Sequence, residues 1–231
     1  HLMLSKNLDL EPLSGLKWVK GALIIDFSPE LDLYTGGLRN LTHAGEVRIS
    51  APGGSSYDTH FDLSALQRLD SIGHLSVSEI RLTNAFPTLT RLHSLSMYSS
   101  YFMDISWLEN IDLIHALYLN TQIVASQNEA FLAKVIEGGD VKLMYTEFED
   151  FGGLDGVGFL NTLELTGATG KSFSGLADLD STNYFLISDT EVSDGCCGLA
   201  PYLSGDPQPV AFQFSGNSCT LEEIVEGCAV E

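Results

Sequence analysis

The residues with the most defined chemistry are four cysteines, all within the last 36 residues of the 231-residue chain. They are Cys196, Cys197, Cys219 and Cys228. An even number of cysteines at one end predicts two disulfides that close a terminal cap in an oxidising compartment. We expect the adjacent pair to bond to Cys219 and Cys228 rather than to each other, and four buried free thiols are the alternative. Zinc binding is disfavoured because both the CxxC spacing and a nearby histidine are absent.

Motifs for catalysis or cofactor binding are few. Gly170-Lys171-Ser172 is similar to the end of a phosphate-binding loop, but Leu165 stands five residues before Gly170, where such loops need glycine. Gly152-Gly153-Leu154-Asp155 resembles one unit of a calcium-binding β-roll, and it occurs only once. The sequence contains no HExxH, EF-hand or GxSxG motif. We therefore expect a protein that is not an enzyme and that uses no cofactor or metal.

The charge balance narrows the classes of partner. The net charge is −20, from 31 acidic and 11 basic residues. This balance disfavours nucleic acids and anionic membrane surfaces, which need basic patches. No apolar run approaches the roughly 18 residues of a membrane span, so we expect no membrane insertion in this segment. The stretch 1–13 lacks the pattern of a signal peptide, so we expect any such segment to have been removed.

An apolar pattern repeats along nearly the whole chain and must position all of these residues. In 63–78, apolar residues recur every third position from Leu63 to Leu75 and then every second position to Val77. An apolar spacing of three residues that changes to two predicts a curved turn leading into a short strand. Taking the first inward residue of each strand as an anchor gives nine anchors, 20 to 28 residues apart. The anchors are Leu23, Val47, Leu75, Leu95, Leu117, Val141, Leu163, Phe185 and Phe212.

Further apolar columns accompany the anchors. Every anchor is followed two residues later by another apolar residue, and most are preceded by apolar residues nine and six positions earlier. Such a period is typical of a solenoid, whose coils bury their apolar sides against one another. We predict a mainly β, right-handed coil of about nine rungs, similar to leucine-rich-repeat or β-helix proteins, with a parallel sheet and short 3₁₀ or α segments. Phe148 and Val192, seven residues after their anchors, predict a second short strand on each coil.

The position two residues before the anchor has a distinctive composition. It holds Gly21, Gly45, Gly73, His93, His115, Gly139, Asn161 and Asn183. These residue types tolerate positive φ. We therefore predict that each coil turns there through a left-handed conformation into its strand. A metal site shared by His93 and His115 is the alternative.

The end of the chain departs from the repeat. The stretch 218–228 predicts a helix, with Thr220 as its N-cap and Glu223 completing a capping box. We expect Leu221, Ile224 and Val225 to face the last coil and cover its end. The predicted organisation is a solenoid over 1–215 and a disulfide-linked cap over 216–231, both within one domain.

One stretch carries a resemblance to a known family. The pattern Leu-x-x-Leu-x-x-Ile-Gly-x-Leu-x-Val in 66–77, with a second copy in Ala44-Gly45-Glu46-Val47-Arg48-Ile49, resembles the receptor L domain. That family is a leucine-rich-repeat relative found in growth-factor receptor ectodomains and in bacterial and protist surface proteins. The resemblance covers about 13–214 and implies binding of proteins or peptides through a sheet face. The cysteine-rich modules that flank receptor L domains are missing, so a receptor role is not implied.

The outward columns of the predicted sheet carry small polar residues with a few aromatic ones, which suits either a partner or simple solvation. Three coils carry extra residues, and two of these insertions, 26–37 and 50–62, lie near the N-terminal end and are loops of the kind that often carry function. All five arginines lie between residues 39 and 91, so the N-terminal half is the less acidic one. The candidate ligand-binding residues are Tyr57, Asp58, His60, Tyr98, Tyr118 and Arg48.

These observations predict a secreted, periplasmic or cell-surface module that binds a protein, a peptide or a glycan through the sheet face and the N-terminal loops. A structural spacer in a larger surface protein is the first alternative. A polysaccharide-active β-helix enzyme is the second, and it needs paired carboxylates where the central outward column holds only Glu164. Asn40-Leu41-Thr42 matches an N-glycosylation pattern, in which Asn40 would face outward.

Overall fold

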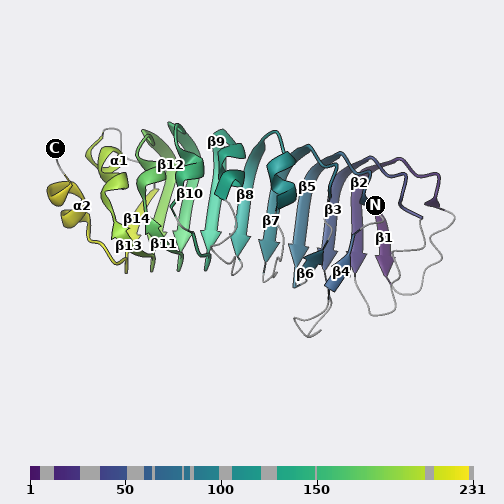
Figure 1. Cartoon of the computed structure of the whole chain (residues 1–231), viewed down its shortest axis with the longest axis horizontal. Coiled ribbons are helices and arrows are strands. Elements are labelled where there is room, and N and C mark those ends of the chain that lie inside the picture. Colours follow the sequence, from purple (N-terminus) through teal and green to yellow (C-terminus); the bar gives the residue numbers. More distant parts are fainter. Residues whose placement is uncertain are drawn as a thin grey trace. The chain divides into compact units, whose positions relative to one another are not determined.

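The computed structural model describes residues 1–5, 13–26, 37–50, 60–63, 66–79, 81–83, 86–98, 106–120, 129–148, 150–205 and 211–228. The chain divides into two compact units, His1–Leu113 and Ile114–Glu231. Figure 1 shows that each unit is built on strands lying side by side, with turns and short helices on the return side. The predicted boundary at residue 216 stays a prediction.

The first unit is built on a parallel sheet with the strand order β1-β2-β3-β5-β7 and a small second sheet of β4 and β6. Its strands are β1 (Leu2–Ser5), β2 (Trp18–Asp26), β3 (His43–Ser50), β4 (His60–Asp62), β5 (Ser71–Ser78), β6 (Arg81–Thr83) and β7 (Arg91–Tyr98). A 3₁₀ turn, Ser106–Asn110, follows β7. Every strand pair in this unit is parallel, because each coil returns to the same edge before the next strand begins.

The second unit repeats this plan with the order β8-β9-β10-β12-β14 and a second sheet of β11 and β13. Its strands are β8 (Ile114–Asn120), β9 (Val135–Met144), β10 (Phe159–Thr166), β11 (Thr169–Ser172), β12 (Ser181–Ser188), β13 (Glu191–Gly195) and β14 (Ala211–Ser215). Its helical segments are the 3₁₀ turns Glu129–Lys134, Gly152–Leu154, Ser174–Leu176 and Cys197–Leu199, and the helices α1 (Ala200–Ser204) and α2 (Leu221–Gly227).

The anchors predicted from the sequence are paired in register within each unit. Leu23, Val47, Leu75 and Leu95 are partners along β2, β3, β5 and β7. The same register joins the five anchors of the second unit. These are Leu117, Val141, Leu163, Phe185 and Phe212. All except Phe212 are fully buried, so the predicted apolar ladder is confirmed.

The predicted count of nine rungs differs slightly from the structure, because each unit has five strands in its main sheet. The additional strand is β1, where Leu2 pairs with Leu23 and Leu4 is buried. The last rung is also less regular than the others. Phe212 in β14 is 39 % exposed, although its ring stacks on Phe185 at 5.3 Å.

The return side of the coils is also apolar, as predicted from the apolar residues nine and six positions before each anchor. Leu38, Leu66 and Leu154 are buried in the first of these columns and Leu41 and Leu69 in the second. The predicted second strand is confirmed by the pairs β4–β6 and β11–β13 and by bridges at Glu147 and Asp150. The packing predicted from the repeat therefore holds on both sides of the coil.

The predicted left-handed column was wrong. Gly21, Gly45, Gly73 and their counterparts lie inside strands, and none of them has positive φ. Of the eight described residues with positive φ, Phe86, Gly138 and Gly156 lie elsewhere, and five lie four residues after an anchor, where the chain leaves the strand. They are Glu79, Tyr145, Gly167, Asp189 and Gly216. In four of these five, the backbone N–H donates to the last strand residue of the next coil, which explains why the exit turn has the same geometry in these coils.

The glycines in the strand column serve close approach between coils. A Cβ at Gly45 would overlap the carbonyl oxygen of Lys20, and one at Gly73 would overlap that of Gly45. A Cβ at Gly139 would lie 2.9 Å from the carbonyl oxygen of His115. Glycine is therefore required at these three positions by space and not by backbone dihedral.

The C-terminal cap is held by two disulfides, Cys196–Cys219 and Cys197–Cys228, with Cα–Cα distances of 6.3 Å and 5.2 Å. Helix α2 begins with the predicted capping box of Thr220 and Glu223. Of the three apolar residues expected to face the last coil, only Ile224 is buried. Leu221 and Val225 are 37 % and 39 % exposed, because a helix of two turns presents one narrow face to its support.

The fold is thus a mainly β, parallel-sheet solenoid with little helix, as the repeat predicted. Among the residues that the structure describes, no helix is long and apolar enough to cross a membrane.

Candidate binding surfaces

The outward face of the second unit carries a connected set of polar and aromatic side chains. Tyr118, Lys142 and Glu164 are partners in register on β8, β9 and β10, one residue after the buried anchors. Since side chains alternate between the two faces of a strand, these three point away from the core. The residue before the anchor shares this face and supplies Asp140 and Tyr184.

Lys142 is the centre of this set. Its ammonium lies 3.0 Å from Oε2 of Glu164, whose side chain is only 17 % exposed. The same nitrogen lies 5.7 Å from the ring centre of Tyr118 and 5.9 Å from that of Tyr184. These distances are in the range of cation–π attraction. One lysine in β9 therefore contacts two tyrosine rings and a carboxylate from three neighbouring strands, β8, β10 and β12.

A second chain of hydrogen bonds runs along the same strands. The Tyr118 hydroxyl donates to Oδ2 of Asp140 at 3.2 Å, and the Asn161 amide donates to Oδ1 of the same carboxylate at 2.6 Å. Asn183 in turn donates to Asn161 at 3.0 Å. Both carboxylates, Asp140 and Glu164, are thus engaged by neighbouring side chains. We call Tyr118, Asp140, Lys142, Glu164 and Tyr184 the tyrosine–lysine patch.

The outward face of the first unit has different chemistry. Arg48 pairs with Glu46 on the same strand, and this hydrogen bond raises the pKa of the guanidinium. His74 Nδ1 lies 2.6 Å from the Ser94 hydroxyl, and Ser50 donates to Asp26 at 2.8 Å. This face is rich in serine hydroxyls and has fewer large side chains than the patch of the second unit.

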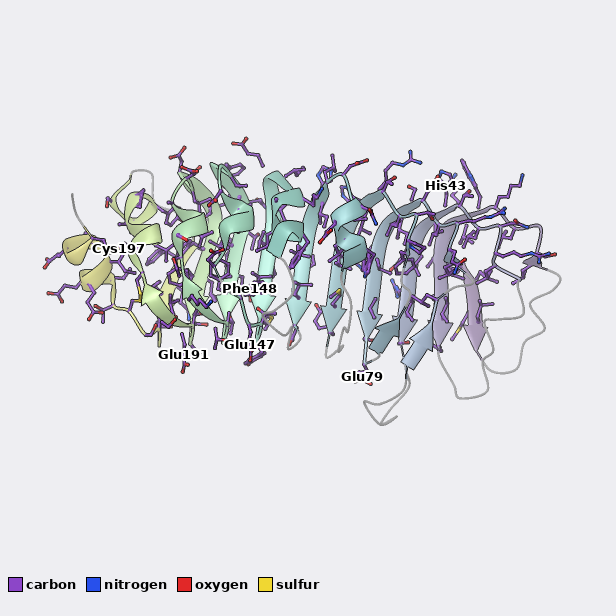
Figure 2. The ribbon with its side chains drawn as sticks, in the orientation of Figure 1. His43, Glu79, Glu147, Phe148, Glu191 and Cys197 are labelled. Carbon is purple, nitrogen blue, oxygen red and sulfur yellow. A yellow bond between two sulfur atoms is a disulfide. The ribbon has the colours of Figure 1, made fainter. Side chains whose placement is uncertain are left out.

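The beginnings of the strands in the first unit hold a second cluster. Trp18 pairs in register with His43, His43 with Ser71, and Ser71 with Arg91. Asp70 Oδ1 lies 3.4 Å from His43 Nε2 and 3.5 Å from Arg91 Nη2. Figure 2 shows His43 at this end of the strands, where nitrogen-bearing side chains gather. We call Trp18, His43, Asp70 and Arg91 the Trp18 row.

The candidate residues chosen from the sequence are distributed unevenly. Tyr57 and Asp58 lie outside the described residues, and His60 begins β4. Tyr98 ends β7 with 48 % of its surface exposed, and Arg48 lies in the middle of β3. The structure places Arg48 and Tyr98 on the first unit's outward face, and it places Tyr118 on that of the second, where Tyr118 joins the network around Lys142.

Sequence reasoning missed Asp140, Lys142 and Tyr184 as site residues. The signal was present in the column one residue before the anchor, which holds Asp140 and Tyr184 beside the column already examined. Trp18 and Arg91 lie in a column further upstream, at the first residue of their strands. Asn40, expected to face outward for glycosylation, uses its amide to donate to the Ser14 carbonyl at 2.6 Å.

The remaining features of the described residues offer less support for a metal or ligand site. Among the described residues, no three His, Cys, Asp or Glu side chains are grouped so that they could hold a metal ion. A hollow of about 500 Å³ lies beside β11, β13 and the turn 216–218. At this edge of β13, Asn217 accepts from the Thr190 amide and Ser218 from the Val192 amide. The turn therefore covers backbone groups that would otherwise be open to pairing.

Comparisons with known proteins bear on the fold. No family model and no curated protein matches the chain. Among solved structures, an internalin from Listeria monocytogenes is similar, with a TM-score of 0.65 and 18 % sequence identity. The match covers 96 % of this chain and 62 % of the internalin chain, so this chain spans less than two thirds of that protein. At this identity the likeness shows the fold alone, which is a solenoid similar to the leucine-rich-repeat fold of the internalin.

Proposed function

We propose that this chain is an extracellular or cell-surface module that binds a partner protein through the outward face of Ile114–Glu231. The observation that carries the proposal is the tyrosine–lysine patch. Tyrosine is enriched among residues that dominate protein interfaces, because its ring offers a large contact area with few rotatable bonds. Here the two rings are already held by Lys142 before any partner arrives, so little side-chain entropy remains to be lost on binding.

The charge of the unit indicates the chemistry of the partner surface. Within 114–231 there are 18 acidic residues and three basic ones, Lys134, Lys142 and Lys171. The ammonium of Lys142 is already paired with Glu164. A field of this sign favours a partner whose contacting surface is basic, and it raises the association rate at low salt.

The extracellular or cell-surface location in this proposal is supported by the two disulfides of the C-terminal cap. Both disulfides lie in a part of the chain that has weak packing of its own, as the exposure of Phe212 indicates. Disulfides persist in oxidising compartments, which supports a secreted, periplasmic or surface-displayed protein. The engaged state of Asp140 and Glu164 favours binding over the polysaccharide-active enzyme, since that chemistry needs carboxylates available to substrate.

The test is a screen of the whole chain against a display library of folded extracellular protein domains, followed by affinity measurements on the hits. Tyr118→Ala with Tyr184→Ala should weaken a genuine hit by at least about thirtyfold, which corresponds to the roughly 2 kcal/mol of a dominant interface residue. Tyr145→Ala is the matched control, since Tyr145 is 58 % exposed but lies on an exit turn. Hits that bind the double variant and the control equally would contradict the proposal and favour a spacer.

A further inference from the structure

We propose that the Trp18 row of the first unit is a binding site for a saccharide chain. This site goes beyond the protein-binding function proposed for the second unit. It is carried by the exposed indole of Trp18, the imidazole of His43 and the guanidinium of Arg91, which lie in register at the starts of their strands, and by the carboxylate of Asp70, which precedes β5 and lies beside the last two.

The indole of Trp18 is the first element of the site. It is 67 % exposed, which is unusual for a tryptophan in a folded domain. The ring of His43 lies 5.5 Å away on the next strand, tilted by 42°, so one edge of the indole is supported while much of its surface stays open to solvent. The apolar C–H face of a sugar ring is complementary to such a flat aromatic surface.

The imidazole of His43 is fixed by its neighbours. Thr42 Oγ1 lies 2.7 Å from His43 Nδ1 and donates its own proton to the Lys17 carbonyl at 3.1 Å. Nδ1 of His43 must therefore carry the hydrogen and donate to Thr42. Nε2 then faces Arg91 Nη2 at 3.5 Å and Asp70 Oδ1 at 3.4 Å. The ring that supports Trp18 is thus oriented without a ligand.

This arrangement argues against catalysis by the same residues. Thr42, His43 and Asp70 occur in the order of a hydroxyl–imidazole–carboxylate triad. In a working triad the hydroxyl gives its proton to the imidazole. Here the Thr42 proton is directed to the Lys17 carbonyl, so the imidazole does not activate the hydroxyl. The Trp18 row can therefore offer hydrogen-bonding groups to a ligand, but it is not arranged to transfer a proton.

The polar groups beside the indole match the hydroxyls of a sugar. The carboxylate of Asp70 accepts hydrogen bonds and the guanidinium of Arg91 donates them, and their side chains are 41 % and 61 % exposed. Their charges offset one another, so the row has no strong requirement for a charged ligand. From Trp18 to Arg91 is three strand spacings, about 14 Å, which is longer than one sugar ring and favours a chain over a monosaccharide.

The test uses affinity electrophoresis of the whole chain in gels that contain laminarin, xylan, dextran or polygalacturonate. We expect retardation by at least one neutral polysaccharide, with the apparent dissociation constant raised tenfold or more by Trp18→Ala. Trp18→Tyr should restore part of the binding because it keeps an aromatic face. Tyr118→Ala in the second unit should bind as the unaltered chain does, which separates this proposal from the protein-binding one.

Intrinsic fluorescence supplies a second readout that does not depend on variants at Trp18. The chain has two tryptophans, and Trp107 is only 4 % exposed. Binding at the row should therefore change the emission of Trp18 in a Trp107→Phe chain. The proposal is overturned by absence of retardation in all four gels. It is also overturned if polygalacturonate alone retards the chain and Trp18→Ala leaves that retardation unchanged, which would indicate charge attraction only.

Discussion

The two units share one backbone plan and differ in what they display on it. Both stack parallel strands with anchors buried in register. The first displays serine hydroxyls and the Trp18 row, and the second displays tyrosines around a single lysine. The repeat constrains the inward columns only, so outward columns can change from one unit to the other without cost to the core.

The units also differ in charge. Residues 1–113 hold eight of the eleven basic residues and 13 of the 31 acidic ones, whereas 114–231 hold three and 18. The net charges are therefore −5 and −15. A field of that size in the second unit steers basic partners, while the first unit is left closer to neutral, which suits a ligand without charge.

Their coils are held together differently as well. In the first unit, Gly45 and Gly73 let adjacent strands approach within the sheet. The second unit has one such glycine in its sheet, Gly139, and a closer approach on the return side, where a Cβ at Gly175 would overlap the Phe151 carbonyl. Phe148, Phe151 and Phe173 pack there with ring centres 5.2 Å and 5.7 Å apart, and all three are buried.

Cys196 continues this aromatic line at its end. Phe151, Phe173 and Cys196 each stand directly before a 3₁₀ turn, in successive coils. The disulfide to Cys219 therefore takes the place that another phenylalanine would fill. The same end holds Tyr202, whose ring stacks on Phe185 at 4.7 Å and whose burial raises the pKa of its hydroxyl. The C-terminal end of the second unit is thus held by disulfides and by stacked aromatic rings.

Removal of the disulfides should give the largest difference between the units. Each bond closes a loop of 23 or 31 residues, and such a loop contributes about 3 kcal/mol to the free energy of unfolding. We expect Cys197→Ser with Cys228→Ser to lower the stability of the second unit by about that amount and to leave the first unit unchanged. Hydrogen exchange resolved by peptide would show this, and equal loss of protection in both units would contradict the comparison.

Substitution of the close-approach glycines should act on one unit at a time. Gly73→Ala places a methyl group against the Gly45 carbonyl, and Gly175→Ala places one against the Phe151 carbonyl. We expect each to cost about 1–3 kcal/mol, the usual range for overpacking. Gly15→Ala is the control, because nothing lies within 4 Å of its added Cβ. Urea unfolding checks the ranking, which fails if Gly15→Ala is as harmful as Gly73→Ala.

The features that the sequence could predict are those encoded by the repeat or by local motifs. The anchors, the second strand and the capping box are local or periodic, so the sequence sufficed for Leu75, Phe148 and Glu223. The prediction of positive φ two residues before each anchor was wrong for a physical reason. Glycine at Gly45 allows the close approach of the Lys20 carbonyl, whereas positive φ occurs in the exit turns, at non-glycine residues such as Tyr145. The network of Lys142 joins four strands through side-chain conformation, which no spacing rule encodes.

Two threonines on the return side of the second unit offer a finer test. Thr146 and Thr190 occupy equivalent positions and are both buried. The Thr190 hydroxyl donates to the Ser188 carbonyl at 3.2 Å, whereas the Thr146 hydroxyl has no partner among the described residues. We expect Thr190→Val to cost about 1 kcal/mol and Thr146→Val to be neutral or stabilising. The midpoint of thermal unfolding should fall in Thr190→Val and stay the same or rise in Thr146→Val, and a fall in both variants would contradict the assignment.

The smallest expected effect is a dependence of the cap helix on pH. The carboxylate of Glu223 accepts from the Thr220 amide at 2.8 Å and from the Thr220 hydroxyl at 3.0 Å. These bonds, the backbone one first, hold the pKa of Glu223 below its usual value. A carboxyl whose pKa is lower in the folded state stabilises above its unfolded pKa and loses that contribution as the pH falls through the folded one. Protonation should therefore loosen the first turn of α2 in acid and leave it unchanged near neutrality.

The Thr220 amide is the reporter for this titration, because it donates directly to the group that titrates. Its NMR chemical shift should follow an acid transition with a midpoint below that of an ordinary glutamate. In Glu223→Gln the transition should disappear, since the side-chain amide still offers an oxygen acceptor but does not titrate. A midpoint at or above the ordinary value would mean that the capping box does not favour the charged form. The closure of the second unit would then rest on the disulfides and the aromatic line alone.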